Sequence, residues 1–388
     1  MHVVMATQHL ADVGGSETYL YTVADNLVRL GHQVTVHAQH LGVMADQVRS
    51  VGADVVEEDG LPESCDGLLA QDVGMAYTLA ARWPDRPQVF VCHSILYHLQ
   101  TPPALPVPGS VVVTMSDRNT EHVRAMPGGH EVVRLRQPID WARLAPRGTP
   151  ADRPRRALLL GNYLADEARG AIVDAWSAAK VEVVQVGTLA QPTLDVAAAI
   201  ADADIVVGKG RAILEAMSCG RAAFVYDAFG CDGWVTAATY DALEANAFAG
   251  QASPTALGPD GLRAALDDYD PTMGLVNRQL VLTHHNERKH VEALVELFRR
   301  LGPVADDRAT PAAELARLSR LRWRADEESR HLRGQLAETT SRLRETEARL
   351  LLSEQRRRRR ARAARRAEER LAELGHPITD PRHEEERP

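Results

Sequence analysis

The segment IVVGKGRAILEAMSCGRAAFVYD, residues 205–227, decides the fold class of this chain. A short apolar, β-branched run predicts a buried strand at 204–208. The glycines at positions 208 and 210 then allow a sharp turn, residues 212–218 have the composition of a helix, and 222–226 return to an apolar strand. This order predicts two parallel strands joined by a helical crossover.

The same alternation extends through most of the chain. Apolar residues recur at helical spacing over 20–30, and Gly31 ends that predicted helix. Strand-like runs of the first half lie at 3–6, 34–38, 67–70, 89–92 and 111–114, and those of the second half begin at 156–161 and 181–186. The pattern predicts an α/β protein with two Rossmann-like, doubly wound domains.

A change in composition sets the boundary between these domains. Residues 138–154 are rich in Pro, Arg and Gly, as is usual in an interdomain connection. We therefore place the first domain at 1–150 and the second at 151–305. An amphipathic helix at 290–301 is expected to close the second domain.

Charge and composition exclude several classes of protein. Residues 1–300 hold 24 basic and 36 acidic side chains, a net charge of −12, which argues against a nucleic-acid ligand. The four cysteines form no C-x-x-C pair, and no apolar stretch reaches the ~18 residues of a membrane span, so we expect a cytoplasmic protein.

Two patterns of possible metal ligands are too weak to predict a metal site. Asp202 and Asp204 have D-x-D spacing but precede a predicted strand, and His284 and His285 have no third ligand candidate nearby. We predict neither a metal nor an organic cofactor.

Two glycine turns precede helices, where backbone amides and the helix dipole favour anions. The first contains Gly14 and Gly15. The second contains Gly208, Lys209, Gly210 and Arg211, with Glu215 one helical turn later. At the second turn, amides and cations suit a diphosphate and the carboxylate suits the hydroxyls of the adjoining ribose, so we predict diphosphate binding there; the first turn is a weaker anion signal. A glycine turn without a ligand is the alternative at each.

The chain resembles family 4 of the retaining GT-B glycosyltransferases in two motifs. Residues 215–220, EAMSCG, match the helical motif E-A-M-A-x-G of that family's carboxy-terminal domain. Residues 14–17, GGSE, followed by a helix and by GHQVTV at 31–36, match its amino-terminal pattern. The resemblance covers about residues 1–300. It implies a GT-B fold, in which two Rossmann-like domains face a cleft that binds a nucleotide sugar.

The resemblance implies roles for residues on the donor side. Gly14 and Gly15 would face the donor diphosphate, and Glu215 would contact the donor ribose as the second glutamate of the family's Glu-x(7)-Glu motif. Val207 stands in the place of the first glutamate, which usually helps to hold the donor sugar.

The leaving diphosphate needs positive charge around it. The family places an Arg and a Lys after the first strand of the second domain; here Asn162 replaces the Arg, and Arg169 stands for the Lys. Asn162 keeps hydrogen-bond donors but loses the charge. We therefore expect Lys209 and Arg211 to compensate and to act in catalysis.

His93 is the candidate on the acceptor side. It follows the predicted strand at 89–92, at the carboxyl edge where open α/β sheets bind ligands. It resembles the His-Ser or His-Asp step that lines the family's acceptor cleft, and we assign it a catalytic role. A histidine of the core or surface is the alternative.

Residues 311–374 predict an Arg-rich helical tail, and 375–388 a disordered end. The leucines that fit one heptad frame are Leu315, Leu318, Leu332, Leu336, Leu343 and Leu350. The same frame also contains Arg322, Ser329, Thr339 and Thr346. A coiled coil that joins copies of the chain into a homo-oligomer is therefore one reading of the tail.

Arg356 to Arg366 form a dense cationic stretch within this tail. Three interpretations stay open: contact with an anionic membrane surface, binding of another polyanion, or a solvated helix that keeps the protein soluble. The first would place the protein peripherally at the inner membrane face.

These features together predict a metal-independent, retaining glycosyltransferase. It would move a hexose from a nucleoside diphosphate sugar to a carbohydrate or lipid-linked acceptor. One alternative is a catalytically weak GT-B scaffold that binds sugar nucleotides, which Val207 and Asn162 support. Another is a GT-B sugar-nucleotide epimerase, which the Glu-Ala-Met motif disfavours.

Overall fold

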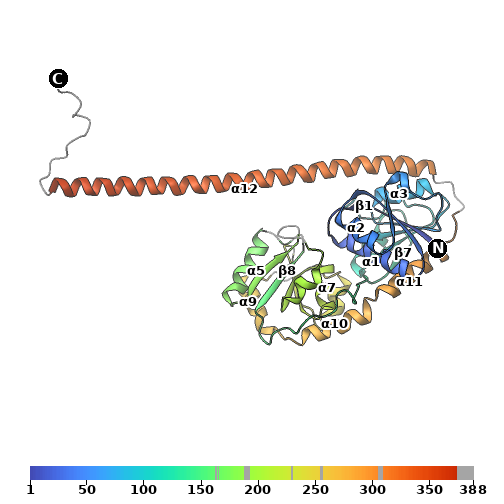
Figure 1. Ribbon diagram of the computed structural model, residues 1–388, viewed down its shortest axis with the longest axis horizontal. Helices are drawn as coiled ribbons and strands as arrows, with labels where there is room; N and C mark the ends of the chain where they lie inside the picture. Colours follow the sequence, from blue (N-terminus) through green and yellow to red (C-terminus); the bar gives the residue numbers. More distant parts are fainter. Residues whose placement is uncertain are drawn as a thin grey trace, which may run out of the picture. The chain divides into compact units, whose positions relative to one another are not determined.

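The computed structural model describes residues 1–161, 164, 166–187, 193–228, 230–253, 257–304 and 309–373. The chain divides into two compact units, Met1–Arg320 and Leu321–Pro388. The first unit contains two α/β domains, and the second contains most of a long helix (Figure 1). The predicted fold class, two doubly wound domains followed by a long helix, is thereby confirmed.

The first domain is built on a seven-stranded sheet of order β3-β2-β1-β4-β5-β6-β7, in which all neighbouring strands are parallel. Its strands are β1 (His2–Leu10), β2 (Gln33–Leu41), β3 (Asp54–Val56), β4 (Gly67–Ala70), β5 (Gln88–Cys92), β6 (Ser110–Thr114) and β7 (Val132–Arg134). Its helices are α1 (Gly15–Arg29), α2 (Val43–Ser50), η1 (Glu58–Gly60), α3 (Val73–Arg82) and α4 (Asp117–Ala125). The strand order reverses between β1 and β4, which is where open α/β sheets bind ligands.

Strand β1 shows why this sheet is covered on both faces. Val3 and Met5 point into one core, which includes apolar residues of α1 and α2. Val4 and Ala6 point into the opposite core, which includes residues of α3. All four side chains are fully buried. Successive strand residues face opposite sides, so a continuous apolar run requires helices on both.

The second domain has a five-stranded sheet of order β12-β11-β10-β8-β9. Its strands are β8 (Arg156–Leu160), β9 (Glu182–Val186), β10 (Ile205–Gly208), β11 (Ala222–Asp227) and β12 (Gly230–Trp234). Its helices are α5 (Asp166–Ala178), α6 (Val196–Ala201), α7 (Arg211–Ser218), α8 (Tyr240–Ala245), α9 (Pro259–Ala264), η2 (Ala265–Asp268) and α10 (Met273–His284). Strand β12 is antiparallel to β11 and was not predicted, because its sequence GCDGW has no regular apolar alternation.

Helix α11 (Glu287–Leu301) corrects one expectation. It occupies the stretch predicted to close the second domain, but Val291 and Leu294 lie in the core of the first. The ring of Phe298 lies against Gly67 of β4, where an added Cβ would stand 2.8 Å from the ring. An amphipathic sequence identifies the helix but not the surface that receives it. Helix α11 therefore returns the chain to the first domain.

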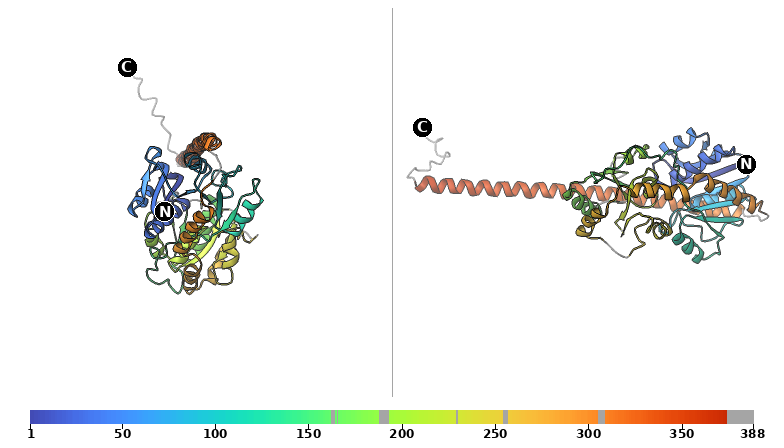
Figure 2. Two further views of the ribbon diagram at one scale, coloured as in Figure 1. Left: turned by 90° about the vertical axis from the view of Figure 1, so that its right-hand side faces the viewer. Right: turned by 90° about the horizontal axis from the view of Figure 1, so that it is seen from below.

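Helix α12 (Ala309–Glu373) forms the predicted tail as one long helix (Figure 2). Its beginning belongs to the first unit, where Ala316 is buried in the core beside α3 and Leu315 packs against that core. Among the described residues, no helix combines the length and the apolar content needed to cross a membrane.

A double-mutant cycle tests the placement of α11. Gly67→Ala should lower the free energy of unfolding by about 1–3 kcal/mol, because the new methyl group meets the Phe298 ring. In a Phe298→Ala background the same change should cost less, and urea denaturation measures the difference. Gly170→Ala in α5 is the control: nothing lies within 4 Å of its added Cβ, so it should be neutral or stabilising. If Gly67→Ala lowered the free energy of unfolding equally in both backgrounds, the contact between Phe298 and Gly67 would be contradicted.

Candidate functional site

The predicted site residues lie where strands end and helices begin. His93 follows β5, and Gly208 is the last residue of β10. Arg211 begins α7, and Gly14 precedes α1. In parallel sheets these are the carboxyl edges, so local chain geometry brings the candidates to the side where ligands bind.

Both glycines of the second turn are required by the fold itself. A Cβ at Gly208 would stand 2.6 Å from the carbonyl oxygen of Leu160 on the neighbouring strand β8. Gly210 has a φ of +57°, in the region that favours glycine, and its N–H donates to the carbonyl of Phe248 at 2.9 Å. The Gly-Lys-Gly pattern thus has a structural cause that is independent of any ligand.

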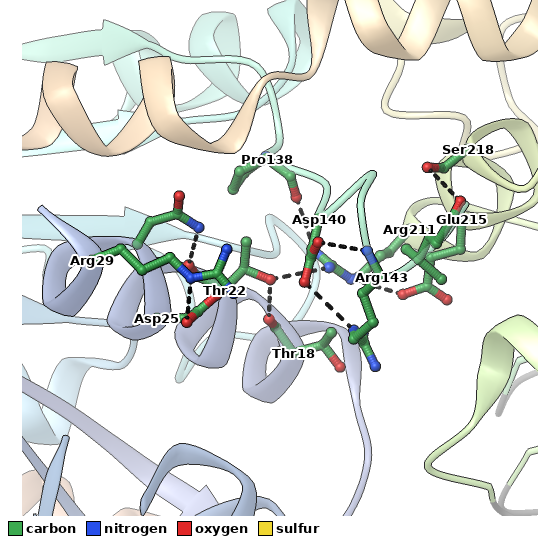
Figure 3. Close-up of polar contacts among 12 residues, drawn as sticks. Thr18, Thr22, Asp25, Arg29, Pro138, Asp140, Arg143, Arg211, Glu215 and Ser218 are labelled. Carbon is green, nitrogen blue, oxygen red and sulfur yellow. Dashed lines mark hydrogen bonds and ion pairs between the residues drawn. The ribbon is translucent and has the colours of Figure 1, made fainter. Parts of the chain in front are cut away.

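Arg211 is buried and makes three hydrogen bonds (Figure 3). Its Nε donates to Glu215 Oε1 at 3.0 Å, its Nη1 to the carbonyl of Pro138 at 3.2 Å, and its Nη2 to the hydroxyl of Thr22 at 3.3 Å. Burial lowers the pKa of Arg211, an effect that the Glu215 carboxylate opposes. The guanidinium therefore joins α7 of the second domain to α1 of the first and to the connection between them.

The connection is held by further polar contacts beside Arg211 (Figure 3). Asp140 Oδ1 accepts a hydrogen bond from the backbone N–H of Arg143 at 2.9 Å, and its Oδ2 lies 3.7 Å from Arg143 Nε. The Arg143 guanidinium lies over the ring of Tyr21 in α1, with its Cζ 5.6 Å from the ring centroid. Ser218 of α7 donates to the carbonyl of Leu144 at 3.1 Å. The connection thus contacts helices of both domains.

Lys209 forms an ion pair with Asp227, the last residue of β11. The Lys209 side chain is partly exposed, whereas Asp227 is buried and its Oδ1 also accepts a hydrogen bond from the N–H of Ala228 at 2.7 Å. Burying a carboxylate is costly unless it is paired, so this contact stabilises the turn. The ammonium group nevertheless lies beside the carboxyl end of β10 and is partly exposed to solvent.

His93 lies in a polar cluster of the first domain. Its Nε2 is 2.5 Å from Gln71 Oε1, and because an amide oxygen only accepts, Nε2 carries the proton and Nδ1 is the acceptor. The ring meets Tyr19 edge-on with 4.9 Å between centroids. Burial, with the charges of Arg211 and His290 as smaller causes, lowers the pKa of His93 to about 3. His93 is therefore neutral at physiological pH.

Two tyrosine–histidine pairs hydrogen-bond to the backbone just before the connection. The first pair is Tyr19 and His290. Tyr19 OH lies 2.8 Å from His290 Nε2, and His290 Nδ1 lies 2.9 Å from the carbonyl oxygen of Arg136. Because a carbonyl only accepts, Nδ1 donates and the tyrosine hydroxyl donates to Nε2.

The second pair repeats this arrangement with the next carbonyl. Tyr240 OH lies 2.8 Å from His285 Nε2, and His285 Nδ1 lies 2.8 Å from the carbonyl of Gln137. The sequence did not predict these pairs. In the sequence His285 stands out only as half of a weak metal-ligand pattern, and no spacing signal links it to Tyr240.

The first glycine turn is covered by its own helix. Gly14 caps α1, and the carboxylate of Glu17 folds back so that its Oε2 accepts a hydrogen bond from the Ser16 hydroxyl at 3.0 Å. An added Cβ at Gly14 would overlap this carboxylate, whereas one at Gly15 would have nothing within 4 Å. Burial raises the pKa of Glu17. Its carboxyl group thus occupies the helix start where an external anion was predicted.

The remaining donor-side predictions concern three positions. Asn162 lies outside the described residues. Arg169 lies exposed on α5, and its Nε donates to Gln185 Oε1 of β9 at 2.6 Å. Val207 is fully buried within β10, between β8 and β11, so the position of the family's first glutamate falls inside the core of the sheet.

Comparison with solved structures identifies the architecture. A glycosyltransferase from Rickettsia africae ESF-5 superposes with a TM-score of 0.53 at 12% sequence identity, covering 77% of this chain and 98% of that one. Anabaena Alr3699/HepE, solved in complex with UDP and glucose, superposes with a TM-score of 0.54 at 13% identity, covering 76% and 99%. The chain has the GT-B fold. A scan against protein-family models and a search of curated proteins find no match.

The two buried histidines predict acid sensitivity. Burial lowers the pKa of both His285 and His290 to about 4, below the 6.5 of an unfolded histidine. Between these values the unfolded chain binds more protons, so this stability is complete above pH 6.5 and is lost as the pH falls toward 4. Over this range each histidine should make the free energy of unfolding rise with pH by up to about 1.4 kcal/mol per pH unit.

Urea denaturation of His290→Gln between pH 4 and 7 tests this slope. The variant should show a shallower pH dependence than the wild type, since glutamine does not titrate. Tyr19→Phe is the control, because it removes one hydrogen bond but leaves the buried imidazole, and it should keep most of the slope. If the free energy of unfolding of His290→Gln depended on pH as steeply as that of the wild type, His290 would not cause the acid sensitivity.

Proposed function

We propose that this chain is a nucleotide-sugar-dependent glycosyltransferase that transfers a hexose, with retention, to a carbohydrate or lipid-linked acceptor. The observation that carries the proposal is the hydrogen bond from Arg211 to Thr22. It joins the helix after the Gly208–Gly210 turn to the helix after the Gly14–Gly15 turn, although the two residues are 189 positions apart. The GT-B fold adds support, since HepE holds UDP and glucose on the same fold.

In this proposal Glu215 binds the donor ribose. Its Oε1 accepts from Arg211, and within the described residues no hydrogen bond is recorded for Oε2. That oxygen is the one we expect to accept from a ribose hydroxyl. Arg211 then holds the carboxylate in place and does not itself need to reach the donor.

The diphosphate would be held from both domains. The amides at Gly14 and Gly15 become available when the Glu17 carboxylate moves away from the helix start, where it competes with an anion. Lys209 would exchange its contact with Asp227 for the diphosphate. Lys209 then gains a negative partner in the diphosphate, whereas the buried Asp227 carboxylate loses its cation and keeps the N–H of Ala228, a cost that donor binding has to exceed.

His93 would position the acceptor. Its unprotonated Nδ1 can accept a hydrogen bond from an acceptor hydroxyl at neutral pH. The bond between the anomeric carbon and the diphosphate oxygen breaks while the acceptor oxygen bonds to the same face of the sugar. The acceptor proton passes to the leaving diphosphate, whose charge Lys209 and Arg169 would stabilise. No metal ion takes part in this scheme.

One observation favours a second function, a sugar-nucleotide-binding scaffold with little turnover. Lys209, Arg211 and Glu17 are each engaged by other groups of the protein, and Val207 occupies the place of a donor-sugar ligand. Purified protein incubated with common nucleotide sugars separates the alternatives. Slow hydrolysis of one donor supports the transferase, whereas binding without turnover supports the scaffold.

Glu215→Gln tests the ribose contact. It should weaken binding of the nucleotide sugar by about 1–3 kcal/mol in calorimetry, because a charged acceptor is lost. Glu244→Gln is the matched control: Glu244 is also buried and pairs with Arg134 of the first domain at 2.6 Å, but it belongs to α8 and not to the segment from Gly208 to Glu215. Equal donor affinity in folded Glu215→Gln and wild type would remove the assignment. If both variants lost the same donor affinity, the effect would come from the packing of the domains and not from a ribose contact.

We also propose that the arginines at 356–366 bring the protein to an anionic membrane surface, where a lipid-linked acceptor would lie. The whole stretch is exposed on α12. Full-length protein should sediment with anionic vesicles at low salt and be released as ionic strength rises. A chain ending at residue 353 should not sediment, and it keeps Ala316 in the core of the first domain. Sedimentation of both forms alike would remove the membrane role of the arginines.

A further inference from the structure

Helix α12 carries a row of exposed leucines. Leu332, Leu336, Leu343 and Leu350 are between 56% and 67% exposed. Their spacings of four, seven and seven residues put them on one side of a helix with a 3.5-residue repeat. We call the whole row the leucine seam: positions 329, 336, 343 and 350, alternating with positions 332, 339, 346 and 353, the a and d sites of one heptad frame.

Two threonines interrupt the leucines, and Ser329 and Ser353 stand at the two ends of the seam. The hydroxyl of Thr339 donates to the carbonyl of Gln335 at 2.8 Å, and that of Thr346 to the carbonyl of Arg342 at 2.8 Å. Each hydroxyl is satisfied within its own helix, so burial of the residue would leave no polar group unpaired. What each threonine offers to a partner helix is therefore its methyl group.

Charges beside the seam indicate the partner. In a parallel pair of helices in register, each g residue faces the e residue five positions later on the other helix. The three charged pairs of this kind are Glu328 with Arg333, Arg342 with Glu347, and Arg349 with Glu354. All three are opposite in charge, and each forms twice in a symmetric dimer.

The reverse orientation is disfavoured by the same residues. An antiparallel pair places g residues opposite g residues and e opposite e, which brings Arg342 toward Arg349 and Glu347 toward Glu354. We propose that residues 329–353 form a parallel, in-register two-stranded coiled coil with a second copy of this chain.

Forming these contacts costs little within each helix. Arg342 pairs with Glu338 and Arg349 with Glu345 on the same helix, and all four side chains are exposed. Exposed pairs of this type contribute only about 0.3–0.5 kcal/mol. The arginines can therefore turn toward, or be shared with, the other helix.

Arginines limit the coil at both ends. Arg322 occupies the a site before the seam, and Arg357 and Arg360 occupy the next a and d sites after it. In a dimer these would place like charges against each other at the centre of the interface. The coil therefore ends near residue 353, and the two stretches at 356–366 diverge from the same end of the dimer.

The first experiment measures the mass of the full-length protein by sedimentation and light scattering over a range of concentrations. The wild type should be a dimer that dissociates on dilution. Leu343→Asp should raise its dissociation constant by about a hundredfold or more, because two buried leucines are lost. Leu352→Asp is the matched control, since Leu352 is 57% exposed but lies at a c site outside the seam. A monomeric wild type, or equal effects of both variants, would overturn the proposal.

The second experiment tests whether the charges beside the seam meet across the dimer. The acidic variant Arg342→Glu/Arg349→Glu and the basic variant Glu347→Arg/Glu354→Arg should each be monomeric, because every affected g–e contact becomes repulsive. Mixing them should restore a dimer, since all these contacts then join opposite charges. Failure of the mixture to associate, or dimers of each variant alone, would overturn the charge contacts across the dimer.

A cysteine supplies an independent check in the wild-type background. Ser353→Cys, at a d site, should form a disulfide-linked dimer under mild oxidation, because d residues meet their own counterparts only in a parallel, in-register coil. The four native cysteines are buried, so the background should be low. Circular dichroism and the melting temperature of each variant confirm that the α/β domains remain folded. The absence of cross-linking in folded protein would contradict the register.

Discussion

The organisation of the α/β unit depends on neutralising one buried charge, the guanidinium of Arg211. Removing such a group from water costs several kcal/mol, so it must meet acceptors from the surrounding protein. The Glu215 carboxylate supplies the compensating negative charge. The carbonyl of Pro138 and the hydroxyl of Thr22 supply the remaining hydrogen-bond acceptors. Three segments are thereby required to meet: α7, the connection and α1. The Arg-Glu spacing within α7 is a local feature, but its effect is to set the contact between two domains.

The sequence predicted the elements of the central segment well because periodicity and glycine are local signals. β10, α7 and β11 all lie within the quoted stretch. What it missed is long-range. Arg211 looked like a free cation because its other acceptors come from residues far away in the chain. Helix α11 looked like part of the second domain because the surface that receives it includes Gly67, which lies more than 200 residues earlier in the chain.

Of the candidate site, the sequence predicted that the residues lie at the carboxyl ends of the strands but could not state what they touch. Gly208 and Gly210 are needed for strand packing and for a positive φ, so the same letters that suggest a phosphate turn are also explained by folding alone. The pairing of Lys209 with Asp227 and the neutral state of His93 follow from burial and from partners on other strands. Such partners have no fixed spacing in a sequence.

The return of α11 to the first domain has a consequence for synthesis on the ribosome. The core of that domain includes Val291, Leu294 and Phe298, so it is incomplete when residue 150 has been made. At roughly 5–20 residues per second, the missing helix follows after about 8–30 s. The second domain, whose core residues lie within 139–281, has all of its chain available sooner. The amino-terminal domain, although translated first, is completed last, and until then the part of its core that α11 covers stays open to chaperones.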